Sequence, residues 1–157
     1  MGATAQDVMN TDIESVRDDM PVRDLAAFLI DREISGAPVL DAVGRLVGVV
    51  SLTDIVMSDA EASGTEREES PSPFFTAGWE RKMNLADFAE VPIHNEGLSV
   101  RDIMTPTVYT LPEDTPIHKI ARTMVTGRIH RLLITHNEKV IGVVTSLDLL
   151  KLLCESP

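Results

Sequence analysis

The sequence contains one unit twice, and this repeat limits the folds that the chain can adopt. The segment Leu46-Val-Gly-Val-Val-Ser-Leu-Thr-Asp54 recurs 94 positions later as Val140-Ile-Gly-Val-Val-Thr-Ser-Leu-Asp148. Earlier matches, such as Asp7-Val-Met9 with Asp102-Ile-Met104, lie 95 positions apart. The one-residue difference arises between 41–45 and 136–139, in a polar turn, where a hairpin tolerates a change of length. The chain is therefore expected to fold as two similar halves.

Both copies show the same order of expected elements. A short helix ends at Met9 or Met104, an extended segment follows (13–16 or 108–111), and then comes a helix with a proline in its first turn. The apolar positions of this helix recur at helical spacing in both copies: Val22, Leu25, Ala26 and Leu29, and Ile117, Ile120, Ala121 and Met124. The strands expected next are 37–40 and 46–50, and 132–135 and 140–144; the closing helices are 52–57 and 146–153.

This order predicts a mixed α/β (α+β) fold. Two β-α-β-β-α repeats would pack through their small sheets with pseudo-two-fold symmetry, because each sheet has one face that needs cover. We expect the first repeat over 1–59, an insert over 60–98 and the second repeat over 99–157. The insert begins as an acidic, proline-punctuated linker. It continues with most of the aromatic residues, Phe74, Phe75, Trp79 and Phe88, which predict a helix docked on the outer face of the repeats or an element that binds a partner.

Composition excludes several classes of function. The net charge of −11 opposes binding to a nucleic-acid backbone. No apolar run approaches the roughly 20 residues of a membrane span, and the start shows no secretory signal, so we expect a soluble cytoplasmic protein without membrane contact. The single cysteine, Cys154, falls on the apolar side of the last expected helix, which favours a packed thiol.

Two polar pairs stand where a strand runs into a helix, Ser51 with Asp54 and Thr145 with Asp148. A hydroxyl residue followed three positions later by a carboxylate is a capping box, which satisfies backbone donors without any ligand. An ionised carboxylate can also accept hydrogen bonds from the two hydroxyls of a ribose, and a helix N-terminus favours a phosphate. Spacing alone leaves both interpretations open.

Longer motifs resemble the CBS domain, which occurs as a tandem pair called a Bateman module. They are Ile34-Ser-Gly-Ala-Pro-Val-Leu-Asp41, Gly44-Arg-Leu-Val-Gly-Val-Val-Ser-Leu-Thr-Asp54 and Asp102-Ile-Met-Thr-Pro106. The resemblance implies clefts between the repeats that hold an adenosyl ligand, AMP, ADP, ATP or S-adenosylmethionine. It also implies that Asp54 and Asp148 bind the ribose, with Ser51 and Thr145 beside the ligand.

A second feature distinguishes the two copies. His130 and Arg131 resemble the His-Arg pair that contacts phosphates in the gamma subunit of AMP-activated protein kinase, whereas the first copy has Ser35 and Gly36 there. We therefore expect the cleft with Thr145 and Asp148 to bind phosphate better. Surface ion pairs are the alternative role for His130 and Arg131. The resemblance also implies a cleft wall from the first repeat, formed by Ile34, Ser35, Gly36, Ala37 and Pro38.

Motifs for catalysis are missing from the sequence. It contains no Gly-rich phosphate loop, no His-Glu-x-x-His and no cysteine pair, and His94, His118 and His136 fall at no metal-ligand spacing. The main hypothesis is thus a non-enzymatic regulatory protein that senses an adenine nucleotide, needs no cofactor or metal, and signals to an unidentified partner. A ligand-free dimerisation or interaction module is the alternative. A homodimer is expected by resemblance, and the apolar face with Leu149, Leu150, Leu152 and Leu153 fits it.

Overall fold

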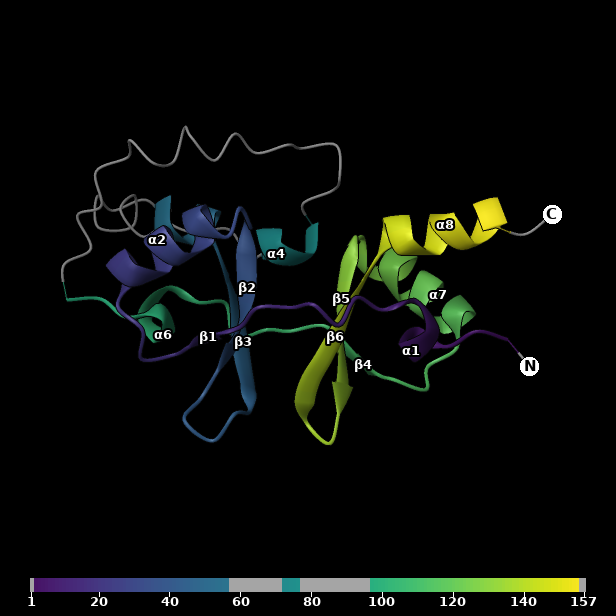
Figure 1. Ribbon diagram of the computed structural model, residues 1–157, viewed down its shortest axis with the longest axis horizontal. Helices are drawn as coiled ribbons and strands as arrows, with labels where there is room; N and C mark the ends of the chain where they lie inside the picture. The colour runs from purple at the N-terminus through teal and green to yellow at the C-terminus, as the bar shows by residue number, and fades with distance from the viewer. Residues whose placement is uncertain (1, 57–71, 77–96, 156–157) are drawn as a thin grey trace. The chain divides into compact units, whose positions relative to one another are not determined.

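Each copy of the repeat forms a three-stranded sheet with a parallel and an antiparallel pair. The computed structural model describes residues 2–56, 72–76 and 97–155 (Figure 1). The first sheet has the order β1 (Val16–Arg17), β2 (Gly36–Leu40), β3 (Leu46–Ser51). The second has the order β4 (Thr110–Pro112), β5 (Arg131–His136), β6 (Lys139–Thr145). The predicted mixed fold with two small sheets is therefore confirmed.

Helices stand where the parallel strands need a crossover connection. α2 (Val22–Asp31) joins β1 to β2, and α7 (Ile117–Gly127) joins β4 to β5. Their prolines, Pro21 and Pro116, are N-cap residues in extended conformation, one position before the predicted first turn. The remaining helical segments are α1 (Ala5–Val8), 52–56, α4 (Pro73–Thr76), α6 (Val100–Ile103) and α8 (Ser146–Glu155).

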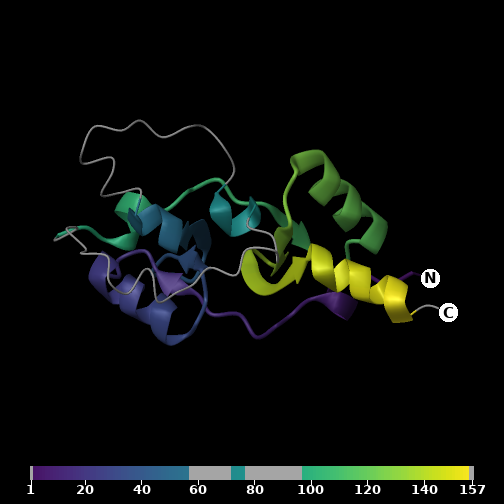
Figure 2. The ribbon, with the colours of Figure 1, turned by 90° about the horizontal axis from the view of Figure 1, so that it is seen from above.

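The predicted apolar stripe of α2 forms the core of its repeat. Its four apolar residues are at most 5% exposed and pack against Val39 and Val50 of the sheet. On α7 the corresponding stripe is buried only at Ile120 and Met124. α7 and α8 lie side by side (Figures 1 and 2), and none of the residues of α8, 146–155, is fully buried. Cys154 is accordingly exposed, so the prediction of a packed thiol is wrong.

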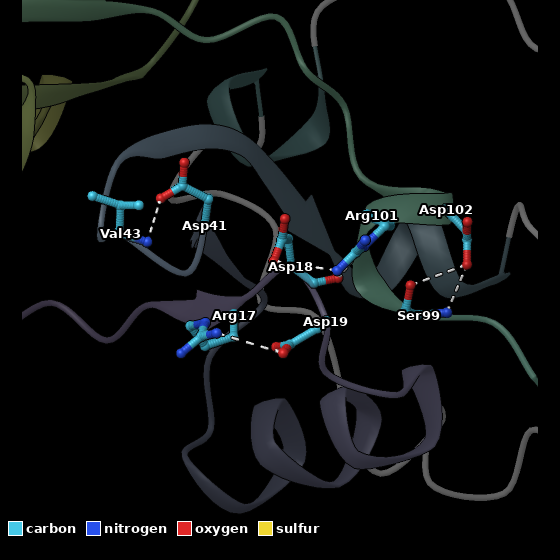
Figure 3. A network of polar contacts seen from close by, with 8 residues as sticks. All are labelled: Arg17, Asp18, Asp19, Asp41, Val43, Ser99, Arg101 and Asp102. Carbon is cyan, nitrogen blue, oxygen red and sulfur yellow. Dashed lines mark hydrogen bonds and ion pairs between the residues drawn. The ribbon is translucent and has the colours of Figure 1, made fainter.

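The two hairpins differ in their turns, as the change of spacing predicts. Asn137 and Glu138 form a two-residue turn with φ of 50° and 68°, the positive values that a tight hairpin requires. In the longer first turn, Oδ1 of Asp41 accepts hydrogen bonds from the backbone N–H groups of Val43 and Arg45, both at 2.9 Å. Figure 3 shows the bond from Val43. The bond from the backbone N–H of Arg45 holds the pKa of the Asp41 carboxyl below its usual value.

The chain folds into two compact units that exchange their N-terminal segments. Among the described residues, the first-repeat unit comprises 14–56, 72–74 and 97–107, and the second-repeat unit comprises 2–13, 75–76 and 108–155. Asn10 and Val143 exchange backbone hydrogen bonds of 2.8 and 3.0 Å, and Val49 and Thr105 exchange two of 2.9 Å. A residue that follows each short helix therefore bridges to the last strand of the other repeat's sheet. These units cut across the sequence boundaries expected at 59 and 98, which remain a prediction.

Capping boxes fix the two short helices. The backbone N–H of Thr4 donates to Oδ2 of Asp7 at 2.8 Å, and that of Ser99 donates to Oδ2 of Asp102 at 2.8 Å. The backbone N–H and the hydroxyl of Ser99 both donate to Oδ2 of Asp102 (Figure 3), and these hydrogen bonds lower the pKa of the Asp102 carboxyl. The aspartates of the two Asp-x-Met motifs are therefore caps, and the methionines follow at the helix ends.

These methionines pack against the repeated glycines. A Cβ on Gly48 would lie 3.0 Å from Sδ of Met104 and 2.7 Å from the backbone oxygen of Thr105. A Cβ on Gly142 would lie 2.6 Å from Sδ of Met9, and its three nearest neighbours would all be side-chain atoms of that methionine. Both glycines therefore allow close approach of a neighbouring segment, but only at Gly48 is the obstacle backbone.

We expect Gly48→Ala to destabilise the protein more than Gly142→Ala. A backbone carbonyl has to move in the first case, at a cost of about 2–3 kcal/mol, whereas a methionine side chain moves aside in the second, at about 1 kcal/mol. Urea denaturation followed by circular dichroism measures both. Gly2→Ala is the control, because no atom lies within 4 Å of its Cβ position. Equal losses at Gly48 and Gly142 would contradict the assignment.

Candidate functional site

The register of the second hairpin brings the predicted phosphate and ribose residues to one edge of the sheet. Arg131 is the first residue of β5, and it pairs with Thr145, the last residue of β6. The backbone N–H of Ser146 donates to the carbonyl oxygen of His130 at 2.9 Å. His130, Arg131 and Thr145 are therefore neighbours at the point where the strand ends and α8 begins.

Asp148 lies one turn into α8 and bonds back to Thr145. The backbone N–H of Thr145 donates to Oδ2 of Asp148 at 2.9 Å, and the backbone N–H of Asp148 donates to Oγ1 of Thr145 at 3.2 Å. Both residues are half-buried. Among the described residues, Oδ1 of Asp148 accepts no hydrogen bond. One carboxylate oxygen thus serves the cap, and the other has no hydrogen-bond donor among the described residues.

Arg131 supplies a positive charge that is partly removed from water. Its burial lowers the pKa of the guanidinium, which nevertheless stays protonated. Because attraction between charges strengthens as the surrounding dielectric falls, such a guanidinium favours an anion that can reach it. His130 is exposed. The predicted contact of Arg131 and His130 with phosphate stays a prediction.

The first repeat builds the same junction with different side chains. Gly36 pairs with Ser51, and the backbone N–H of Leu52 donates to the carbonyl oxygen of Ser35 at 2.9 Å. Oδ2 of Asp54 accepts from the backbone N–H of Ser51 at 2.8 Å and from its hydroxyl at 3.2 Å. Ser51 is 3% exposed and Asp54 is 1% exposed. The hydroxyl and carboxylate of this repeat are therefore buried, unlike those of the second.

Both polar pairs have the geometry of a capping box, so this interpretation is confirmed at both junctions. The same bonds do not test the ligand role of either pair, which stays a prediction. The residues expected to form a cleft wall lie at the start of β2. Ile34, Ser35 and Gly36 are half-buried, whereas Pro38 is buried and Ala37 is part of the core of the first-repeat unit. Their contact with a ligand also stays a prediction.

The turns that lead into these strands were not predicted. Glu33 and Arg128 occupy equivalent positions and have φ of 56° and 54°, in the left-handed region that non-glycine residues enter at a cost. Directly after them, the backbone N–H of Ile34 donates to Leu29 and that of Ile129 donates to Met124, both at 3.0 Å. These turns end the crossover helix and start the strand. No glycine marks either position, so the sequence carries no clear signal for them.

The aromatic insert contributes a second unpredicted part of this region. In α4, Phe74 is 5% exposed and Phe75 is fully buried. The carbonyl oxygen of Phe75 accepts from the backbone N–H of His130 at 2.7 Å, and its ring meets that of Tyr109 edge-on at 5.0 Å. Phe74 and Phe75 are thus buried, whereas docking of the insert as a helix on the outer face of the repeats stays a prediction. Trp79 and Phe88 lie outside the described residues.

The repeat, the strand-to-helix junctions and the two sheets point to one family. A family model of the CBS domain matches residues 5–61 and 100–155. The chain belongs to the CBS-domain family. Protein MJ1426 of Methanocaldococcus jannaschii is 32% identical over 151 residues, which cover 94% of this chain and 89% of that protein. The predicted family is therefore confirmed, with both CBS repeats present.

Solved structures of CBS domain pairs share the fold. The pair of protein MJ0100, in complex with 5′-methylthioadenosine and S-adenosyl-L-methionine, has a TM-score of 0.66 at 20% identity, with 100% of both chains covered. CBSX2 in complex with AMP has a TM-score of 0.68 at 23% identity, with 98% of both chains covered. The chloroplastic CBSX2 of Arabidopsis thaliana is 26% identical over 147 residues, and the chain spans 60% of its length.

Two further observations concern the described part of this CBS protein. Within residues 2–56, 72–76 and 97–155, no cluster of three or more His, Cys, Asp or Glu side chains has an arrangement suited to a metal ion. The helices of the same residues are too short or too polar to span a bilayer.

We expect Asp54→Ala to destabilise the fold more than Asp148→Ala. Asp54 is buried, and its loss leaves buried donors of Ser51 without an acceptor, at a cost of about 2 kcal/mol. Asp148 is half-buried, and losing its cap costs about 1 kcal/mol. Chemical denaturation measures both, with Asp54→Asn and Asp148→Asn as controls that keep an acceptor oxygen. A larger loss at Asp148 would contradict this order.

Proposed function

We propose that this chain is a non-catalytic regulatory module that binds an adenine nucleotide, AMP, ADP or ATP, and passes its occupancy to a partner protein. The observation that carries the proposal is the pairing of Arg131 with Thr145, which sets a guanidinium beside a hydroxyl and a carboxylate. The AMP complex of CBSX2 supports this ligand class. The complex of MJ0100 makes S-adenosylmethionine the second candidate.

Each group of the second CBS repeat has a separate task in this proposal. Oδ1 of Asp148 accepts a ribose hydroxyl, because Oδ2 is already engaged by the cap. Arg131 makes a bidentate contact with phosphate, and the exposed His130 makes a second one. The overall charge of −11 does not oppose a small anion here, since charges beyond about 10 Å are screened.

Regulation follows from linkage. A ligand that binds one arrangement of the two units more tightly shifts the population toward it, and a partner that distinguishes the arrangements reads the change. The ligand's own contacts therefore have to differ between the arrangements by the coupling free energy, which is typically about 1–3 kcal/mol. No reaction of the nucleotide is required.

We expect AMP, ADP or ATP, at about 100 times its dissociation constant, to stabilise the protein by about 2.7 kcal/mol. For a chain of this length the melting temperature then rises by about 5–10 °C. A thermal-shift panel of the three nucleotides, S-adenosylmethionine and NAD measures the effect. If none of the five raises the melting temperature, the ligand proposal fails and a ligand-free interaction module takes its place.

Within that panel, Asp148→Asn and Arg131→Gln are expected to weaken nucleotide binding by about ten- to a hundredfold, because each removes a charge-assisted contact of about 1.5–3 kcal/mol. Asp148→Asn keeps the cap acceptor, so the loss does not reflect unfolding. Asp54→Asn is the matched variant in the first repeat, and isothermal titration calorimetry measures all three. Equal losses at Asp54 and Asp148 would mean that the repeats bind equivalently.

We also expect this chain to form a homodimer through α8. Leu147, Leu150 and Leu153 recur every third residue and are 40%, 48% and 72% exposed. An exposed apolar stripe on one helix favours association with another copy. Replacing Leu150 and Leu153 by Glu should turn the dimer into a monomer in analytical ultracentrifugation without loss of nucleotide binding. A monomeric wild-type protein would refute this prediction.

A further inference from the structure

The two junctions make equivalent backbone hydrogen bonds but carry different side chains. Gly36 pairs with Ser51 as Arg131 pairs with Thr145, and Ser35 accepts from the first helical N–H as His130 does. Gly36 and Arg131 are therefore equivalent residues. In the second repeat a long cationic side chain leaves the strand at this position, and in the first repeat no side chain does.

A residue of the insert packs beside Gly36. A Cβ on Gly36 would lie 2.7 Å from the backbone oxygen of Val50, 3.1 Å from Cδ2 of Phe74 and 3.3 Å from Cα of Ser51. The neighbouring strand and the ring of Phe74 thus both stand on the side of Gly36 from which a side chain would extend. The backbone N–H of Phe74 donates to the hydroxyl of Ser72, which is 3% exposed, so both residues of this turn are buried.

The exposed fraction of Phe74 indicates whether its ring covers the junction or stacks on a base. A ring that stacks on a base has to keep one face open, but Phe74 is only 5% exposed. Beside it, Ser51 and Asp54 are 3% and 1% exposed, whereas Thr145 and Asp148 are half-buried. Phe74 also brings an apolar group to the position where the other repeat carries the guanidinium, which makes the place hostile to phosphate. The ring of Phe74 therefore covers the junction and is not open to stack on a base.

We infer that Phe74 closes the nucleotide site of the first repeat, so that one chain binds one nucleotide and binds it at the second repeat. Segment 72–76 is then a built-in occupant, and Phe74 is the residue that determines which repeat is open. The inference rests on the proposed nucleotide binding for its stoichiometry, but the closure itself is a property of the free protein.

Calorimetric titration with AMP tests the stoichiometry. We expect one site per wild-type chain, lost in Asp148→Asn. Phe74→Ala should add a second, weaker site that disappears again in the double variant Phe74→Ala/Asp54→Asn, whereas Phe74→Leu, which retains most of the cover, should stay at one. Two sites in the wild-type protein, or one site in a Phe74→Ala variant whose circular dichroism is unchanged, would overturn the inference.

Thiol reactivity tests the closure without any nucleotide. Cys154 is the single cysteine, so a Cys154→Ser background carrying Ser51→Cys presents one thiol, at the covered junction. Its reaction with 5,5′-dithiobis(2-nitrobenzoate) should be slow and should accelerate at least tenfold on Phe74→Ala. An unchanged rate would refute the closure even if AMP binds. Failure of the wild-type protein to bind any nucleotide, with this acceleration present, would instead refute the proposed function alone.

Discussion

The register of the two hairpins is the constraint on which the rest of the site depends. Side chains alternate between the two faces of a strand. A slip of one residue between β5 and β6 would therefore move Arg131 away from the hydroxyl of Thr145. Both hairpins keep the same strand pairing at the strand-to-helix junction, although their turns differ in length by one residue. Each also contains an irregularity, between Val39 and Leu40 and between Ile134 and Thr135. Differences in length are therefore absorbed away from the junction.

The capping boxes hold the carboxylates of both junctions in place. Asp54 and Asp148 accept backbone N–H groups that a helix start leaves without partners, so their carboxylates are held at fixed positions. Ahead of the strand, Glu33 and Arg128 adopt a left-handed conformation that costs roughly 1–2 kcal/mol each. Both repeats have this unfavourable conformation, at equivalent positions. It sets the direction in which each strand begins, and hence where Ser35 or His130 stands.

Much of this architecture could be predicted from the sequence, because the two copies of the repeat can be aligned with each other. The β-α-β-β-α order, the apolar stripe of α2 and the change of spacing in the turn all follow from patterns within each copy. The exchange of N-terminal segments could not be predicted. Asn10 and Thr105 bond to backbone groups of distant strands, and backbone bonding leaves no mark on side-chain periodicity. Burial at the ends of elements was also unpredictable, as exposed Cys154 and buried Phe74 show.

The candidate site illustrates the same limit from another side. Sequence identifies Ser51 with Asp54 and Thr145 with Asp148 as equivalent pairs, and the backbone confirms their equivalence. It does not reveal that a residue from the insert packs beside Gly36, where a Cβ would lie 3.1 Å from Cδ2 of Phe74, because Phe74 belongs to neither copy of the repeat. Contacts between a repeat and an insertion depend on the path by which the chain returns to the repeat. Neither secondary-structure propensity nor residue spacing predicts that path.

The difference between the repeats fits a conflict between stability and the proposed binding. The buried Asp54 loses more when its cap is broken, whereas the half-buried Asp148 keeps Oδ1 without a hydrogen bond from the described residues. One copy of a repeated unit can serve stability alone only if the other serves binding. In the proposed division, the junction of Ser51 and Asp54 serves stability, and that of Thr145 and Asp148 beside Arg131 serves binding. Two copies of the junction can thereby meet separately the requirements of stability and access, which a single junction would have to meet together.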